Sequence, residues 1–138
     1  NWQMTRPKSL WGMHVEYLPN FYLMIGPQSL NPVTNVTLLC EEQGKYIANL
    51  VARMRREGAH EVEPMAEAVA DWTERCNASA DGKVWLRCNN WYMKSTKSDI
   101  EAGRERSQGM WMDTYETYLQ HVLGGAGGSQ DALLQFRD

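Results

Sequence analysis

The chain has 138 residues, of which 43% are hydrophobic and 22% charged, and this size and composition fit one ordinary globular unit. A formal net charge of -3 leaves no basic stripe of the kind that contacts phosphate backbones, so nucleic acid is not an expected partner. No apolar run reaches the roughly 18 residues of a membrane span, and the first residues do not read as a signal peptide, so we expect a cytoplasmic protein. Position 1 is Asn rather than Met, and we therefore expect the chain to begin inside a longer protein.

The first predicted element is a short buried strand. A turn signal at Pro19-Asn20 precedes a continuous apolar run from Phe21 to Ile25, and Gly26-Pro27 ends that run. Such a run is typical of a parallel strand covered on both faces. A strand of this kind needs neighbours, and the sequence offers no second run like it. We therefore expect an α/β fold whose remaining strands lie outside this chain.

Helices follow the predicted strand. Apolar residues recur with a period of about 3.6 over Thr37–Arg56, and Gly58 is a natural stop. A second helix is predicted for Met65–Cys76 and a short strand for Lys83–Cys88. The remaining expectations are a surface loop over residues 94–108, a helical turn or two within Met110–Val122, and a flexible linker at 124–129.

One stretch resembles the end of the FAD-binding region of the Baeyer–Villiger monooxygenases. Residues 18–29 read LPNFYLMIGPQS, and Thr34-Asn35 follows them. In that family a P-N-x-[FY]-x-[ML]-x-G-P-x-S pattern is followed by a T-N pair that opens a helix. The resemblance covers residues 15–122 and implies the last quarter of a longer flavoprotein with two dinucleotide-binding, Rossmann-like domains.

The resemblance also implies a set of site residues. It assigns FAD contacts to Gly26, Pro27, Thr34, Asn35 and Val36, and places Val36 beside the substrate as well. Unpaired N–H groups at the start of a helix are electropositive and suit the negative charge of a reduced flavin. Read without the resemblance, the same residues form an ordinary strand, turn and helix in which Asn or Thr caps the helix.

A second stretch is similar to the family's [SN]-W-Y motif. It reads NNWY over residues 89–92, and the resemblance implies that Trp91 lies near the nicotinamide cofactor. The alternative is a tryptophan packed at a domain seam. The family continues W-Y-x-G-A-N-I-P-G-K, whereas residues 94–104 read KSTKSDIEAGR. This departure implies inserted residues in a loop that covers cofactor and substrate.

The family's catalytic signatures do not occur in this sequence. Neither G-x-G-x-x-G loop is present, nor the F-x-G-x-x-x-H-x-x-x-W signature, and we assign no catalytic residue. His14, His60 and His121 lack metal-ligand spacing, so no metal site is predicted.

The resemblance implies a division of the chain and a function for the longer protein. Residues 1–57 would end the FAD-binding domain, 58–122 would form helices and a cover over cofactor and substrate, and 123–138 would be a flexible tail. The parent enzyme would use NADPH, FAD and O2 to insert one oxygen atom into a small-molecule ketone, giving an ester or lactone, while the fragment alone would be inactive. Two alternatives stay open: a flavin monooxygenase that hydroxylates N or S atoms, and a non-catalytic fragment that only binds another chain.

Overall fold

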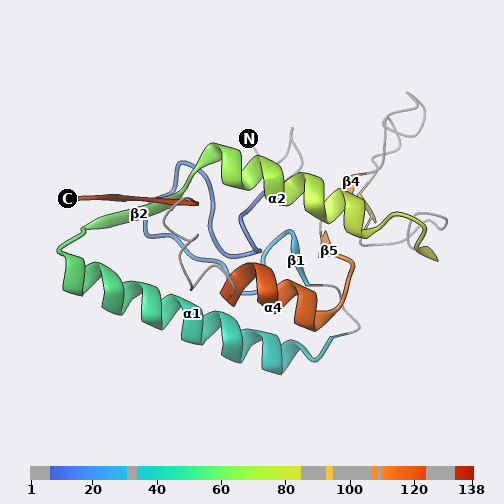
Figure 1. The fold of residues 1–138 in the computed structure, drawn as a ribbon, viewed down its shortest axis with the longest axis horizontal. Helices are drawn as coiled ribbons and strands as arrows, with labels where there is room; N and C mark the ends of the chain where they lie inside the picture. Colours follow the sequence, from blue (N-terminus) through green and yellow to red (C-terminus); the bar gives the residue numbers. More distant parts are fainter. Residues whose placement is uncertain (1–6, 31–33, 85–92, 95–106, 109, 124–132) are drawn as a thin grey trace.

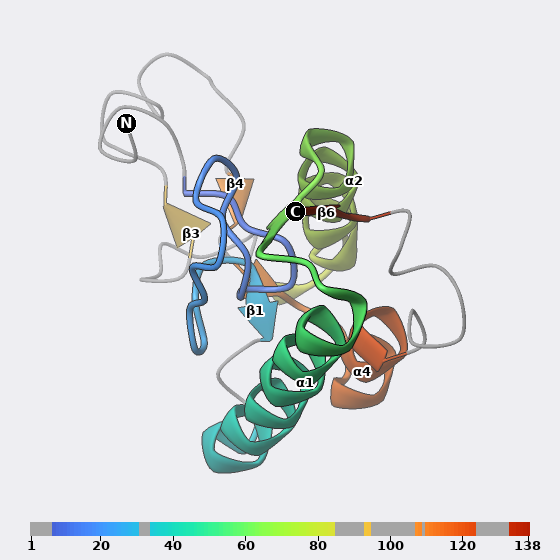
Figure 2. The ribbon, with the colours of Figure 1, turned by 90° about the vertical axis from the view of Figure 1, so that its left-hand side faces the viewer.

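The computed structural model describes residues 7–30, 34–84, 93–94, 107–108, 110–123 and 133–138. Its α/β arrangement packs two long helices against an irregular N-terminal segment, coloured blue. Figure 1 shows this segment between the two helices, and Figure 2 shows it beside one helix and above the other. The helices are α1 (Val36–Glu57), α2 (Ala66–Ser79) and α4 (Tyr115–Leu123). The strands are β1 (Ser29–Leu30), β2 (Glu61–Pro64), β3 (Met93–Lys94), β4 (Ser107–Gln108), β5 (Met110–Trp111) and β6 (Leu134–Arg137).

The predicted strand at Phe21–Ile25 is wrong, because the buried strand begins only at Ser29. Phe21 and Met24 are each 46% exposed, which does not fit a strand covered on both faces. Ile25 has a left-handed backbone, with φ of 55°, and this turns the chain out of extended geometry. The apolar run is therefore a partly exposed approach to the strand rather than the strand itself.

The expectation that every neighbouring strand lies outside the chain is also wrong. β1 pairs in parallel with β5, in the register Ser29 to Met110 and Leu30 to Trp111. Two-residue strands leave too little periodicity for a sequence pattern to reveal. The parallel pair brings residues more than eighty positions apart side by side at the centre of the unit (Figure 1).

Both predicted long helices are confirmed. The buried side chains of α1 recur every three or four residues and form one stripe, which comprises Leu39, Gln43, Tyr46, Leu50 and Met54. Gly58 ends α1 with a φ of 76°, and its N–H donates to the carbonyl of Met54. The second helix runs to Ser79, three residues beyond the predicted end. None of the helices among the described residues is long and apolar enough to cross a membrane.

The expected flexible tail contains a strand. β6 pairs antiparallel with β2 over four residues, from Glu61 opposite Arg137 to Pro64 opposite Leu134. Arg137 forms ion pairs with Glu61 and Glu63, and Leu134 is buried. The prediction failed because β6 has only one buried side chain in four, so its pairing depends on β2 and not on its own pattern.

The remaining predictions fall partly outside the described residues. Met93–Lys94 pairs antiparallel with Ser107–Gln108, so the ends of the predicted loop 94–108 are strands, and residues 95–106 between them lie outside. Residues 85–88 of the predicted Lys83–Cys88 strand also lie outside, and the described Lys83 and Val84 are not in a strand. The expected helical turns near the C-terminus are confirmed as α4, a helix of nine residues.

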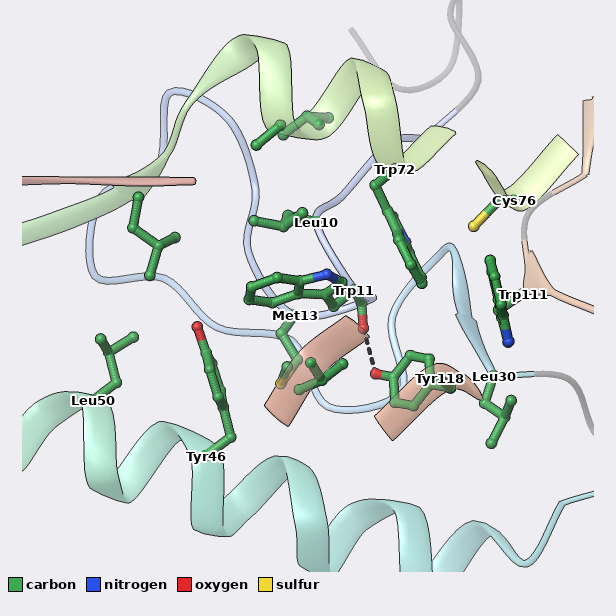
Figure 3. Packing of buried hydrophobic residues seen from close by; sticks show 14 of the residues in the cluster. Leu10, Trp11, Met13, Leu30, Tyr46, Leu50, Trp72, Cys76, Trp111 and Tyr118 are labelled. Carbon is green, nitrogen blue, oxygen red and sulfur yellow. Dashed lines mark hydrogen bonds between the residues drawn. The ribbon is translucent and has the colours of Figure 1, made fainter. Parts of the chain in front are cut away.

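One hydrophobic core joins these elements. Trp11 and Met13 from the N-terminal segment pack between Tyr46 of α1 and Trp72 of α2, as Figure 3 shows. Trp72 stacks on Trp111, with ring centroids 5.0 Å apart. Aromatic side chains from the N-terminal segment, α1, α2 and β5 therefore lie at the centre of this core.

Candidate functional site

The predicted site residues fall on two consecutive segments. Gly26 and Pro27 form the turn that leads into β1, and Thr34, Asn35 and Val36 form the start of α1. Trp91 lies outside the described residues. The two segments flank β1 in sequence, and Figure 1 shows the turn and β1 in blue and the start of α1 in cyan.

The start of α1 is capped by Asn35. Its side-chain oxygen accepts hydrogen bonds from the N–H groups of Thr37 at 3.0 Å and Leu38 at 3.2 Å. Its carbonyl accepts from the N–H of Leu39 at 3.1 Å. The capping alternative is therefore confirmed for Asn35, and a cap does not prevent the positive end of a helix from facing a ligand.

The same helix start is exposed and carries no negative charge. The first turn of α1 contains no acidic residue, and the Val36 side chain is 51% exposed. Leu38, two residues on, is 40% exposed. An exposed apolar side chain beside electropositive N–H groups suits a flat ligand that is apolar on its face and negatively polarised at its edge.

The turn requires glycine at two positions that pack against each other. The Gly26 N–H donates to the carbonyl of Gly12 at 2.9 Å, and a Cβ on Gly26 would lie 2.6 Å from that oxygen. Gly12 itself has a φ of 75°, and a Cβ there would lie 2.4 Å from the Cβ of Ser29. The close approach that Gly26 permits is thus made by the chain's own backbone.

Gln28, the residue after Pro27, is held by hydrogen bonds from the N-terminal segment and from α2. Gln28 is buried, and its side-chain oxygen accepts from the Ser9 N–H at 2.8 Å while its amide donates to the hydroxyl of Thr73 at 3.0 Å. Its carbonyl accepts from the indole N–H of Trp72 at 3.0 Å. The Ser9 hydroxyl also donates to the Pro27 carbonyl. α2 and the N-terminal segment therefore fix one side of the turn.

Gln43 of α1 holds the other side. Its side-chain oxygen accepts from the Ile25 N–H at 2.9 Å, and its amide donates to the hydroxyls of Ser29 at 3.1 Å and Tyr118 at 2.8 Å. The Tyr118 hydroxyl donates in turn to the carbonyl of Trp11 at 2.6 Å, the dashed line in Figure 3. Burial raises the pKa of Tyr118 to about 12, so its hydroxyl stays a donor at neutral pH.

A buried histidine lies on the α1 side of the N-terminal segment. His14 is 1% exposed, and its Nε2 lies 2.8 Å from the hydroxyl of Tyr46. The rings of Trp11, Tyr22 and Tyr46 surround it at centroid distances of 5.3 to 6.2 Å. Burial lowers the pKa of His14 to about 4, so the imidazole is neutral at pH 7 and acts as a packed core residue.

In the described residues, the candidate site is made of backbone groups and not of grouped titratable side chains. Among the described residues, no three His, Cys, Asp or Glu side chains are grouped so that they could share a metal ion. Cys76 is buried against the Gln28 carbonyl, and burial raises the pKa of its thiol. What the site offers is a fixed backbone turn and a helix start.

Sequence reasoning missed the residues that hold the turn. Gly12, Gln28, Gln43 and Tyr118 do so, and none was singled out as functional. One signal was present: Gln43 is a polar residue on an otherwise apolar helix stripe, four positions after Leu39 and three before Tyr46. Nothing local marks Tyr118 or Gly12, because their partners are distant in sequence.

Comparisons with known proteins agree with this arrangement. No protein-family model matches the chain. A Baeyer–Villiger monooxygenase of Pseudooceanicola batsensis is 33% identical over 85 residues, which cover 62% of this chain and 15% of that protein. The 2-oxo-Delta(3)-4,5,5-trimethylcyclopentenylacetyl-CoA monooxygenase of Pseudomonas putida is 26% identical over 90 residues, covering 65% of this chain and 16% of that protein.

Solved structures share the fold over almost the whole chain. Cyclohexanone monooxygenase from Rhodococcus sp. Phi1, bound to NADP+, superposes with a TM-score of 0.83 at 23% identity, covering 99% of this chain and 24% of that one. OTEMO in complex with FAD and NADP gives a TM-score of 0.82 at 19% identity, covering 98% and 24%. The chain thus has the fold of a segment of the flavin monooxygenases.

Within that class, both the sequence and the fold of the chain are similar to those of Baeyer–Villiger monooxygenases, as those of a fragment of such a protein would be. The resemblance inferred from the LPNFYLMIGPQS stretch is therefore confirmed at the level of the family. The chain spans about a sixth of the length of the curated relatives it matches.

Proposed function

We propose that the chain forms the part of a Baeyer–Villiger monooxygenase that holds the pyrimidine edge of FAD. Gly26 and Pro27 would present the turn, and Thr34, Asn35 and Val36 would present the helix start. The observation that carries this proposal is the start of α1, which is exposed, capped by a neutral Asn35 and free of acidic residues in its first turn.

The chain's own contribution would be electrostatic and steric. The electropositive helix start favours negative charge on the flavin edge, and the exposed Val36 side chain gives an apolar contact to the ring and to a ketone beside it. When bound, FAD reduced by NADPH would supply the oxygen chemistry that converts a ketone into an ester or lactone. Trp91 would contact the nicotinamide cofactor.

The proposal includes a longer protein. Residues 1–57 would complete a Rossmann-like FAD-binding domain, and 58–122 would cover cofactor and substrate. The phosphate-binding glycine loops would come from an upstream part of the same polypeptide, because neither loop occurs in residues 1–138. The chain alone would accordingly be inactive and bind flavin weakly.

A titration that separates the two halves of FAD tests this proposal. Chain labelled with ¹⁵N is titrated with FMN, which carries the isoalloxazine ring, and with AMP, which does not. We expect FMN at millimolar concentration to shift the amide signals of Gly26, Val36 and Thr37, and AMP to leave them unchanged. Absence of FMN-specific shifts at these positions would refute the assigned contacts. Submicromolar quenching of FAD fluorescence would refute the need for upstream residues.

A further inference from the structure

Gln43 differs from every other residue on the buried stripe of α1. The stripe is otherwise made of Leu39, Tyr46, Leu50 and Met54, and Gln43 is only 1% exposed. Burying an amide in a hydrophobic core is unfavourable unless all its polar atoms find partners. An unbranched Met has nearly the same length and would fill the same space without that cost.

The Gln43 amide is fully used, and all three of its partners belong to the neighbourhood of the candidate site. The oxygen accepts from Ile25, the residue before Gly26, and the nitrogen donates to Ser29, the first residue of β1. Its second N–H reaches the Tyr118 hydroxyl on α4. The turn of Gly26 and Pro27 is therefore bracketed on both sides by hydrogen bonds to one side chain.

The hydrogen bond to Gln43 stabilises an unfavourable backbone conformation at Ile25. Its left-handed φ of 55° is unfavourable for a β-branched residue and persists only where other contacts hold it. The bond from its N–H to Gln43 is buried in part and joins residues 18 positions apart. Without that bond, the Ile25 backbone can return to an extended conformation and carry Gly26 with it.

Tyr118 extends the arrangement to the C-terminal elements. It is fully buried, accepts from Gln43, and donates to the Trp11 carbonyl beside Gly12. α4 also follows β5 after three residues, and β5 pairs with β1 on the far side of the turn. The position of α4 is thus linked to both ends of the turn, through Tyr118 and through β5.

We propose that Gln43 is a positioning residue, which fixes the Gly26–Pro27 turn relative to the start of α1, and that Tyr118 makes this position depend on α4. The importance of the position for flavin rests on the function proposed above, whereas the hydrogen-bond coupling does not.

Amide hydrogen exchange on the full chain tests the coupling without flavin. We expect Gln43→Met to speed exchange of the Ile25 amide about tenfold more than that of the Val69 amide, since a lost hydrogen bond is worth about a factor of ten. Tyr118→Phe should speed Ile25 exchange by a smaller factor and add little to Gln43→Met in the double variant, as expected of residues in one network. Leu50→Ala is the matched control from the same stripe, and it should speed both amides equally.

The outcomes separate this proposal from the preceding one. If Ile25 exchange in Gln43→Met stays within twofold of wild type after correction by Val69, or if Leu50→Ala gives the same selective effect, the positioning role is overturned. Should Gln43→Met fail to give a dispersed amide spectrum, Tyr118→Phe decides by the same criterion. In the FMN titration, Gln43→Met should weaken the Gly26 shift while Leu50→Ala keeps it. If wild type shows no FMN shift but Ile25 exchange responds as expected, the flavin proposal falls and the coupling stands.

Discussion

The turn around Gly26 and the start of α1 are neighbours in sequence but use their polar groups in opposite ways. At the turn, the N–H of Ile25, both backbone groups of Gly26 and the carbonyl of Gln28 have partners inside the chain. At the start of α1, the side chains of Asn35 and Val36 are exposed. One region is a rigid support built by tertiary contacts, and the other is a surface that can meet a ligand. Substitutions in the first should change stability, and those in the second should change binding.

The largest effect on the free energy of unfolding is expected at Gly12, which packs against the turn around Gly26. Gly12→Ala places a Cβ 2.4 Å from the Ser29 side chain on a residue with a φ of 75°. Overpacking and left-handed strain should together lower the free energy of unfolding by about 3 kcal/mol or more. Gly58→Ala is the control, because Gly58 has nearly the same φ but nothing within 4 Å of an added Cβ. It should cost about 1 kcal/mol. Equal losses for the two variants in urea unfolding would show that backbone strain alone matters at Gly12.

The buried histidine next to the support should make stability depend on pH. The pKa of His14 is lowered from 6.5 to about 4, so between these values the unfolded chain binds a proton that the folded chain does not. Stability from this group is complete above about pH 6.5 and is lost as the pH falls toward 4, by about 3 kcal/mol in all. His121, whose pKa is also lowered by burial, adds a smaller loss of the same sign.

One substitution isolates the His14 contribution. His14→Gln can keep a hydrogen bond to Tyr46 but cannot titrate, so the stability profile between pH 4 and 6.5 should become flatter. An unaltered slope in His14→Gln, measured by urea unfolding at each pH, would contradict the assignment.

Substitutions at the start of α1 should change stability less than those at the turn, and should change FMN binding more clearly. Asn35→Ala removes the cap from the N–H groups of Thr37 and Leu38 and should cost about 1 kcal/mol. Asn35→Asp keeps a capping oxygen, so its stability should stay within about 0.5 kcal/mol of wild type. Its carboxylate opposes a negatively polarised flavin edge, however, and should reduce the FMN-induced shift at Val36. An Asn35→Asp variant with an undiminished FMN shift would indicate that the flavin edge does not face this helix start.

The smallest expected effect is a gain in stability from a substitution in α1 next to Gln43. Gly44 lies within α1, beside Gln43, and nothing lies within 4 Å of a Cβ added there. Gly44→Ala should raise the free energy of unfolding by about 0.5 to 1 kcal/mol through helix propensity. The FMN shifts should not change. A loss of stability would mean that α1 is packed more closely at this point than its open surface indicates.

The sequence by itself determined the helices and the resemblance to a family. The apolar stripe and Gly58 located α1 to within about a residue at each end, because an amphipathic helix is specified by local periodicity and by its caps. The ordered match over residues 18–29 led to the Baeyer–Villiger monooxygenases, and the comparisons confirm it. The contacts assigned to Gly26, Pro27, Thr34, Asn35, Val36 and Trp91 stay predictions.

Only the tertiary structure decided where the strands lie and what holds the turn. The pairing of β1 with β5 and of β2 with β6 joins residues seventy or more positions apart, and strands of two to four residues have no periodicity that would reveal them. For the same reason Phe21–Ile25 was mistaken for a strand: its apolar run is real, but the left-handed Ile25 and the contact between Gly12 and Gly26 override it. Hydrogen bonds such as that from Tyr118 to Trp11 depend on chain segments that meet only after folding, so no local pattern encodes them.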